Sequence, residues 1–213
     1  MARMVAPRPI KPASPGSVRI IAGHWRGTRL PVADAAGLRP TPDRVRETLF
    51  NWLQGSLAGA RVLDLFAGSG ALGLEAVSRG ASEAVLVERD PQLARSLRTT
   101  VARLQGGDRV EVACADALAW LRSPPHGQFD LVFVDPPYAA GLWDAVLAAL
   151  PPWLAPGAWL YLESPADAAM GPGPGWLQHR EGTTREARYA LYRHDPDYDG
   201  RGSAGAATLP PVS

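Results

Sequence analysis

The sequence predicts an α/β fold built on a doubly wound, mostly parallel sheet. From residue 61 onward, short apolar runs alternate with longer stretches of helical periodicity, which is the pattern of repeated strand–helix–strand units. A glycine-rich turn follows the first of these strands, and acidic residues end several of them. Because open α/β sheets bind ligands beyond the carboxyl ends of their strands, these residues mark the expected site.

The individual elements follow from length and periodicity. We expect five parallel strands, at 62–65, 84–88, 110–113, 130–134 and 159–163. The helices between and after them are expected at 71–79, 91–105, 117–122 and 142–154. Two further strands, 177–180 and 187–192, follow a Gly- and Pro-rich loop and would complete a seven-stranded sheet as a terminal antiparallel pair.

The chain length of 213 residues, without an internal repeat, favours one domain with tails. We expect a disordered basic arm at 1–17 and a disordered tail at 195–213, because both ends offer little to bury. The folded domain would span 18–194. Within it, 18–57 would form an N-terminal hairpin and helix, and 58–194 the core that contains the sheet.

Composition excludes several classes of protein. No apolar stretch reaches membrane-spanning length, and the first residues lack the apolar core of a signal peptide, so we expect a cytoplasmic protein without membrane contact. The single cysteine, Cys114, cannot form an internal disulfide and is expected to be a small buried strand residue. The four histidines show no metal-ligand spacing, which predicts that the protein has no metal site.

Positive charge is concentrated near the N-terminus. Residues 1–47 carry nine Arg or Lys and three Asp or Glu, a net +6, which leaves −5 for the rest of a chain whose total is +1. A basic segment on a mildly acidic body is typical of a nucleic-acid-binding surface, although a solvated arm without a partner has the same composition. Residues 18–32 are predicted to form a hairpin whose loop carries Trp25, either to stack on RNA or to pack the hairpin onto the body.

A helix is predicted to follow this hairpin at 41–53, with Thr41 or Asp43 as its N-cap. The residues that recur at helical spacing, and so form its buried face, are Val45, Leu49, Trp52 and Leu53. The arginines at the start of this helix would lie near the ligand edge of the sheet.

The turn after the first strand of the sheet carries Gly68, Gly70 and Gly73 in G-x-G-x-x-G spacing, which is typical of nucleotide-binding turns. Asp64 stands just before this turn. A carboxylate there would repel a pyrophosphate and favour a cationic ligand. S-adenosylmethionine is such a ligand, because it carries an ammonium and a sulfonium.

Two more acidic residues follow the next strands. Glu88 ends the second strand and can accept hydrogen bonds from both ribose hydroxyls of a nucleoside. Asp116 follows the third strand and can accept one from an adenine amine. The alternatives are that Glu88 is a solvated strand end and that Asp116 only caps the helix that begins at residue 117.

A stiff turn, Asp135-Pro136-Pro137-Tyr138, ends the apolar strand at 130–134. The two prolines fix their own φ angles and donate no backbone hydrogen bond, so the turn presents carbonyls and a carboxylate beside an aromatic ring. This arrangement suits a planar substrate with N–H donors, such as a nucleobase amine. Asp135 could accept from N1–H and N2–H of guanine together, whereas adenine has an acceptor beside its amine.

The chain resembles a known family in three places: Arg39 to Glu47, which contains Arg-Pro-Thr and Asp-Arg-Val-Arg-Glu, Asp64 to Glu75, which is DLFAGSGALGLE, and the turn that begins at Asp135. These segments are similar to those of the RsmD family of bacterial 16S ribosomal RNA guanine-N2 methyltransferases, which methylate guanine 966. The similarity covers about residues 18–193. Many members have Phe where this chain has Tyr138.

The resemblance implies a class I S-adenosylmethionine-dependent methyltransferase, Rossmann-like, that acts on 16S rRNA in the 30S ribosomal subunit, and we expect it to be a monomer. The expected catalytic residues are Asp135, Pro136, Pro137 and Tyr138. The expected cofactor-binding residues are Asp64, Phe66, Ala67, Gly68, Gly70, Glu88 and Asp116. The expected RNA-binding residues are Arg26, Arg29, Arg39, Arg44 and Arg46.

Other functions remain open at this point. The same tetrapeptide serves adenine-N6 methyltransferases and protein-amide methyltransferases. A non-catalytic RNA-binding factor for ribosome assembly would keep the fold but would not need both the glycine turn and the tetrapeptide. An NAD-linked dehydrogenase is the weakest alternative, because Asp64 opposes a pyrophosphate.

Overall fold

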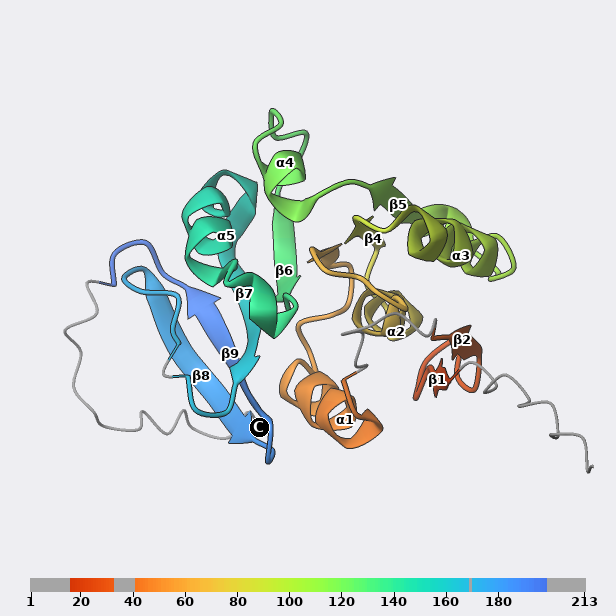
Figure 1. The fold of residues 1–213 in the computed structure, drawn as a ribbon, viewed down its shortest axis with the longest axis horizontal. Coiled ribbons are helices and arrows are strands. Elements are labelled where there is room, and N and C mark those ends of the chain that lie inside the picture. Colours follow the sequence, from red (N-terminus) through yellow and green to blue (C-terminus); the bar gives the residue numbers. More distant parts are fainter. Residues whose placement is uncertain (1–15, 33–40, 169, 199–213) are drawn as a thin grey trace, which may run out of the picture.

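The computed structural model describes residues 16–32, 41–168 and 170–198. Its centre is a seven-stranded sheet in the order β5-β4-β3-β6-β7-β9-β8 (Figure 1). The strands of this sheet are β3 (Arg61–Asp64), β4 (Glu83–Glu88), β5 (Val110–Cys114), β6 (Phe129–Val134), β7 (Leu154–Pro165), β8 (Trp176–Thr183) and β9 (Ala187–His194). The first five run parallel, and β9 pairs antiparallel with both β7 and β8. The predicted fold class is confirmed.

Helices cover both faces of the sheet (Figure 1). They are α1 (Asp43–Trp52), α2 (Ala71–Ser78), α3 (Pro91–Val101), α4 (Ala117–Leu121) and α5 (Trp143–Ala149), with short 3-10 helices η1 (Gly107–Arg109), η2 (Tyr138–Ala140) and η3 (Pro151–Trp153). Alternate residues of β6 point to opposite faces, as strand geometry requires. Phe133 packs with α1 to α3, and Val132 packs with α4 and α5.

Several boundaries differ from the predicted ones. The helix expected at 142–154 is divided, because Pro151 and Pro152 interrupt it: α5 ends at Ala149, and η3 follows. Strand β7 is longer than expected and begins at Leu154. Cys114 is exposed at the end of β5, so the expectation that it is buried was wrong. Its strand lies at the edge of the sheet, where one side has no neighbouring strand.

The N-terminal hairpin consists of β1 (Ser17–Arg19) and β2 (Arg29–Pro31), which pair antiparallel. β1 begins one residue before the expected start of the folded part. The Trp25 side chain in the loop is 5% exposed, and its indole nitrogen donates to the Gln105 carbonyl at 3.0 Å. Trp25 therefore packs the hairpin onto the body, and the alternative in which its ring stacks on RNA is not supported.

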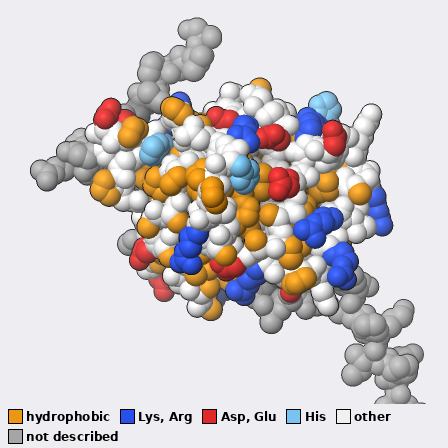
Figure 2. All heavy atoms as spheres, turned by 90° about the horizontal axis from the view of Figure 1, so that it is seen from above, with side chains coloured by type: hydrophobic (Ala, Val, Ile, Leu, Met, Phe, Trp, Pro, Cys, Tyr) orange, Lys and Arg blue, Asp and Glu red, His pale blue; other side chains and the backbone are white. Residues whose placement is uncertain are grey.

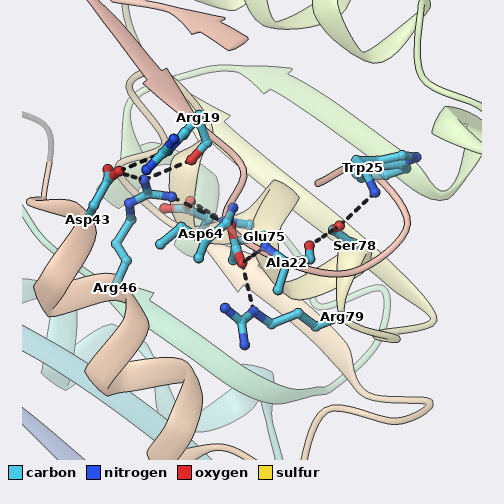
Figure 3. A network of polar contacts seen from close by, with 11 residues as sticks. Arg19, Ala22, Trp25, Asp43, Arg46, Asp64, Glu75, Ser78 and Arg79 are labelled. Atoms are coloured by element: carbon cyan, nitrogen blue, oxygen red, sulfur yellow. Dashed lines mark hydrogen bonds and ion pairs between the residues drawn. The ribbon is translucent and has the colours of Figure 1, made fainter. Parts of the chain in front are cut away.

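A polar network fastens this hairpin to α2 (Figure 3). The buried Glu75 carboxylate accepts from the backbone N–H groups of Ile21 at 2.6 Å and Ala22 at 3.0 Å, and from Arg79 Nε at 2.7 Å. Ser78 donates to the Ala22 carbonyl and accepts from the Trp25 backbone N–H. Because α2 begins at the glycine-rich turn, the hairpin is held beside that turn.

The predicted arm at 1–17 and the predicted tail at 195–213 lie mostly outside the described residues. So does Arg39. At the other end, a described turn extends beyond β9 as far as Tyr198, whose carbonyl accepts from the Gly175 N–H at 2.7 Å. None of the helices in the described part of the chain combines the length and apolar character needed to cross a bilayer.

Candidate active site at the carboxyl edge of the sheet

The parallel strands β5, β4, β3, β6 and β7 end along one edge of the sheet, here called the carboxyl edge. Each of them brings one carboxyl group to this edge. In strand order these are Asp116, Glu88, Asp64, Asp135 and Glu163. We call the first three, which the sequence predicts to bind the cofactor, the cofactor half of the edge. The other two are called the transfer half, because Asp135 is predicted to take part in methyl transfer. The first four were predicted from sequence, whereas Glu163 was not.

The glycine turn joins β3 to α2 in the conformation that the motif predicts. Gly70 has φ +77° and forms the N-cap of α2, a left-handed conformation that glycine adopts readily. At Gly73 the reason for glycine is space: a Cβ there would lie 2.2 Å from Leu86 Cδ2 and 3.3 Å from Asp64 Oδ2. The first turn of α2 therefore packs its backbone directly against β4 and against the Asp64 carboxylate.

Asp64 is 3% exposed, and its Oδ2 accepts from the Gly73 N–H at 3.1 Å. Burial raises the pKa of Asp64 to about 7, against the opposing effect of hydrogen bonds from the Gly73 and Phe66 backbones. A nearby cation would favour the ionised form of this carboxyl. Asp64 is therefore suited to an ammonium group, as the sequence predicted.

Glu88 is 8% exposed and accepts from the Gly68 N–H at 2.9 Å and the Asp90 N–H at 2.7 Å. It is not a solvated strand end. A carboxylate has about four acceptor positions, so these two contacts leave capacity for ribose hydroxyls. Asp116 is exposed and does cap α4, since its Oδ1 accepts from the Ala119 N–H at 3.0 Å. The predicted contact of Asp116 with an adenine amine stays a prediction.

The Asp135 turn lies directly after β6, as expected, and continues into η2. Thr41 was a predicted helix cap, but its side chain makes no capping bond: α1 begins after Pro42, and the Thr41 hydroxyl donates to Asp135 Oδ2 at 3.5 Å. Burial, then the charges of Glu163 and Asp64, raise the pKa of Asp135 well above its usual range. Tyr138, at the end of the same turn, is 37% exposed.

Glu163, near the end of β7, is the residue of this edge that sequence reasoning missed. It is 8% exposed and accepts from the Tyr138 hydroxyl at 3.2 Å and the Tyr161 hydroxyl at 2.8 Å. Burial raises the pKa of Glu163, while these hydrogen bonds and one from Thr41 lower it. Its place at the end of the strand next to β6, with Tyr161 on the same face, was readable in the sequence, but its contact with Tyr138 was not.

The five arginines expected to bind RNA do not share one environment. Arg26, Arg29 and Arg44 are exposed, and Arg39 lies outside the described residues. The prediction that Arg46 binds RNA was wrong, because its side chain is 0% exposed. Its Nη2 donates to the Arg19 carbonyl at 2.9 Å and to Asp43 Oδ1 at 2.7 Å, and its Nη1 lies 3.6 Å from Glu75 Oε2.

The reason for this error is the orientation of α1. The helix buries Arg46 and Phe50, which are four residues apart, together with Val45 and Leu49, while the expected Trp52 is only half-buried.

On the face of the molecule seen in Figure 2, basic and acidic side chains are interspersed around hydrophobic ones, so this face carries both signs of charge. Across the described residues, no three His, Cys, Asp or Glu side chains lie together as metal ligands would.

The parallel sheet with its terminal antiparallel pair, the glycine turn and the row of strand-end acids define the class I S-adenosylmethionine-dependent methyltransferase fold. The family described as "Conserved hypothetical protein 95" matches residues 18–193, and the chain belongs to it. This is the RsmD family that the sequence motifs resemble.

Similar proteins cover most of the chain. "Ribosomal RNA small subunit methyltransferase D" of Escherichia coli strain K12 is 44% identical over 185 residues, which are 84% of this chain and 91% of that protein. The protein of the same name from Haemophilus influenzae is 41% identical over 86% of this chain and 97% of its own length. The solved structure of yhhF from Escherichia coli has a TM-score of 0.78 at 41% identity, and the match covers 85% of this chain and all of that one.

Proposed function

We propose that this protein transfers a methyl group from S-adenosylmethionine to the exocyclic N2 amine of a guanine in 16S ribosomal RNA, guanine 966, in the 30S subunit or its assembly intermediate. The observation that carries the proposal is the position of Asp135 and Tyr138 next to a cofactor half that suits a cationic nucleoside. The relatives named as ribosomal RNA methyltransferases support the choice of RNA as substrate.

The residues of the cofactor half fit S-adenosylmethionine in charge and in hydrogen-bonding capacity. Asp64 would hold the ammonium group, Glu88 the ribose hydroxyls and Asp116 the adenine amine. The backbone of Phe66, Ala67, Gly68 and Gly70 would form the wall against which the ligand lies. When bound, this cofactor supplies an electrophilic methyl group on a sulfonium.

The transfer half would bind and orient the guanine. Asp135 accepts hydrogen bonds from N1–H and N2–H, the Pro136 carbonyl assists at N2, and Pro137 keeps the turn rigid. The base stacks on Tyr138, as flipped bases do on aromatic side chains. Alignment of the amine with the methyl group lowers the barrier, and such orientation contributes about 7 to 11 kcal/mol in favourable cases.

Asp135 also receives a proton. A bound S-adenosylmethionine would supply the methyl group and keep the electron pair of the broken carbon–sulfur bond on its sulfur, so the chain itself has to accept only a proton from N2. The methylated amine then loses one proton to the Asp135 carboxylate. The raised pKa of Asp135 makes this carboxylate a better proton acceptor than an exposed aspartate. Exposed arginines, among them Arg26, Arg29 and Arg44, would contact the RNA phosphates.

The test is Asp135→Asn, assayed with labelled S-adenosylmethionine and 30S subunits that lack the modification. We expect methyl transfer to fall about 100-fold or more, with cofactor affinity nearly unchanged. Asp144→Asn, the same change at an exposed position on α5, serves as the matched control and should keep full activity. Full activity of Asp135→Asn would reject the role of this carboxylate.

The product nucleoside distinguishes the alternatives. N2-methylguanine, mapped to guanine 966, is the expected product. N6-methyladenine or a methylated protein amide would assign the site to a different substrate. Cofactor and RNA binding without any transfer would indicate a non-catalytic assembly factor.

A further inference from the structure

Glu163 lies at the centre of the contacts that fix the transfer half, although it does not belong to the Asp135–Tyr138 turn. Its carboxylate is 8% exposed and each oxygen accepts from a different tyrosine, Oε1 from Tyr138 at 3.2 Å and Oε2 from Tyr161 at 2.8 Å. Tyr161 is wholly buried on the same strand, two residues before Glu163 and on the same face. The strand therefore fixes the direction in which Glu163 points.

The main chain of Glu163 makes a second connection to the same place. The Trp143 indole at the start of α5 donates to the Glu163 carbonyl at 2.8 Å. The Trp143 and Tyr138 rings lie 6.1 Å apart with their planes tilted by 41°. Glu163 thus holds Tyr138 by its hydroxyl and also fixes the aromatic residue that lies beside the Tyr138 ring.

Tyr138 lies in a short and exposed segment, so the contacts of its side chain matter for the orientation of its ring. It begins η2, a 3-10 helix of three residues without any buried side chain. Its ring is 37% exposed, which is unusual among the large hydrophobic side chains described here. The hydrogen bond of its hydroxyl to Glu163 is long, at 3.2 Å, but it connects the far end of the ring to a buried group.

We propose that Glu163 is a positioning residue for methyl transfer: its side chain holds the Tyr138 ring in the orientation on which the target base stacks. This inference rests on the proposed function, because it concerns how the transfer half receives its substrate. Glu163 itself does not contact the reacting atoms. It acts through the Tyr138 hydroxyl, and its effect on catalysis should therefore depend on that hydroxyl.

The test is a double-mutant cycle of Tyr138→Phe, Glu163→Gln and the protein with both changes, with methyl transfer to 30S subunits measured at saturating cofactor. Each single change should lower kcat on the order of fivefold and leave the KM for the cofactor unchanged. Glutamine at 163 has one acceptor oxygen for the two tyrosine hydroxyls that Glu163 receives, and the closer contact is to Tyr161, so the bond to Tyr138 is the one weakened. The double variant should be no slower than Glu163→Gln alone, because both changes act on the same hydrogen bond. Glu111→Gln, at an exposed position on β5, controls for the loss of one carboxylate and should have wild-type kinetics.

A merely structural role for Glu163 makes a different prediction. In that case Glu163→Gln would lower the melting temperature and impair cofactor binding as well as transfer. Its effect on kcat would also be as large in Tyr138→Phe as in the wild type. Multiplicative effects of the two changes, or unchanged kcat in Glu163→Gln, would overturn the positioning role.

Failure of the inference can be told from failure of the proposed function. If the wild type forms N2-methylguanine and the cycle shows no coupling, only the positioning role is lost. If the wild type methylates a different group, the proposed substrate is wrong, and the same cycle, measured on that substrate, still tests the positioning role. If the wild type transfers no methyl group at all, both proposals are rejected.

Discussion

The two halves of the carboxyl edge hold their acids in different ways. In the cofactor half, the backbone does so: Asp64 accepts from the Gly73 N–H, and Glu88 from the Gly68 and Asp90 N–H groups. In the transfer half, side-chain hydroxyls do so: Asp135 accepts from Thr41, and Glu163 from two tyrosines. Backbone donors depend on the path of the chain, whereas hydroxyl donors depend on which residues happen to pack there.

This difference decides how each half responds to substitution. Backbone N–H groups remain after any side-chain change except to proline, so the cofactor half should fail only where the chain path or the charge itself is altered. The transfer half should respond to changes of single hydroxyls. Substitutions of acids, glycines and hydroxyls along this edge and in α2 therefore test the contrast.

The largest loss of stability is expected from substitution of Glu75, because its carboxylate accepts from backbone donors and from side-chain donors. Its carboxylate accepts from two backbone N–H groups of the hairpin and also pairs with Arg79 and Arg46. Glu75→Ala leaves the buried Arg46 without its carboxylate and the part-buried hairpin N–H groups without their acceptor, so the free energy of unfolding should fall by about 3 to 5 kcal/mol. Urea denaturation measures this loss.

Glu83→Ala is the control for Glu75→Ala, because Glu83 pairs with Arg61 while both side chains are partly exposed. That pair should contribute less than about 1 kcal/mol. Equal losses in the two variants would mean that burial of the Glu75 network does not matter for stability.

A smaller loss of stability is expected from a change of the backbone path in the cofactor half, which Gly73→Ala would cause. In Gly73→Ala the new Cβ would overlap Leu86 and press on Asp64, so α2 or β4 must shift. We expect a loss of about 1 to 3 kcal/mol in the free energy of unfolding, the usual range for overpacking, together with weaker cofactor binding. Gly171→Ala is the control, because a Cβ there has its nearest neighbour at 4.0 Å. Wild-type cofactor affinity in Gly73→Ala would contradict a cofactor half that depends on the backbone.

The same contrast explains what the sequence could predict. The donors to Asp64 and Glu88 lie 9 and 20 residues away in sequence, within one strand–turn–helix–strand unit whose glycine spacing is itself a motif. The donor from Thr41 to Asp135 lies 94 residues away, and that from Tyr138 to Glu163 lies 25. Only Tyr161, the other donor to Glu163, is a near neighbour, two residues away on the same strand. Such pairs depend on the order of strands and on the position of α1.

Arg46 was mispredicted for the same physical reason. Its charge suggested a phosphate contact, but its partners are the Arg19 carbonyl and Glu75, which become its neighbours only when the hairpin, α1 and α2 pack together. Helical periodicity correctly predicted that α1 exists and which residues form most of its buried face. It could not place an arginine in that face, because a buried arginine is favourable only with partners that the periodicity does not show.

A smaller effect is expected from the charge of Asp64. The pKa of its carboxyl is about 7, so this group is mostly protonated below that pH. If Asp64 holds the ammonium group as proposed, the cofactor then binds less well. The affinity for S-adenosylmethionine should fall by up to about tenfold per pH unit below 7. In Asp64→Asn the affinity for S-adenosylmethionine should be low at every pH and should not show this slope. The amine of the cofactor also titrates, but it does so equally for both proteins, so the difference between their affinities reports on Asp64 alone. Calorimetric titration from pH 5 to 8 measures both.

Asp64 should also affect stability in the absence of cofactor. The unfolded chain releases this proton near pH 3.8, and the folded protein holds it to about pH 7. The folded state therefore binds more protons in this window, and the free energy of unfolding should decrease as pH rises through it. Asp64→Asn should remove part of this decrease. Parallel stability curves for the two proteins would contradict the raised pKa.

The smallest effect is expected at Thr41, whose hydroxyl is the long-range donor to Asp135. At 3.5 Å this hydrogen bond is weak, so Thr41→Val should lower kcat only about two- to fivefold. The KM for the cofactor should not change, because the backbone contacts of Asp64 and Glu88 are unaffected. The hydroxyl also lowers the pKa of Asp135, so the acidic limb of the pH–rate profile should move to higher pH in Thr41→Val. Thr183→Val, at an exposed position on β8, is the control. If Thr41→Val weakened cofactor binding as much as it slowed transfer, the two halves of the edge would not be separate units.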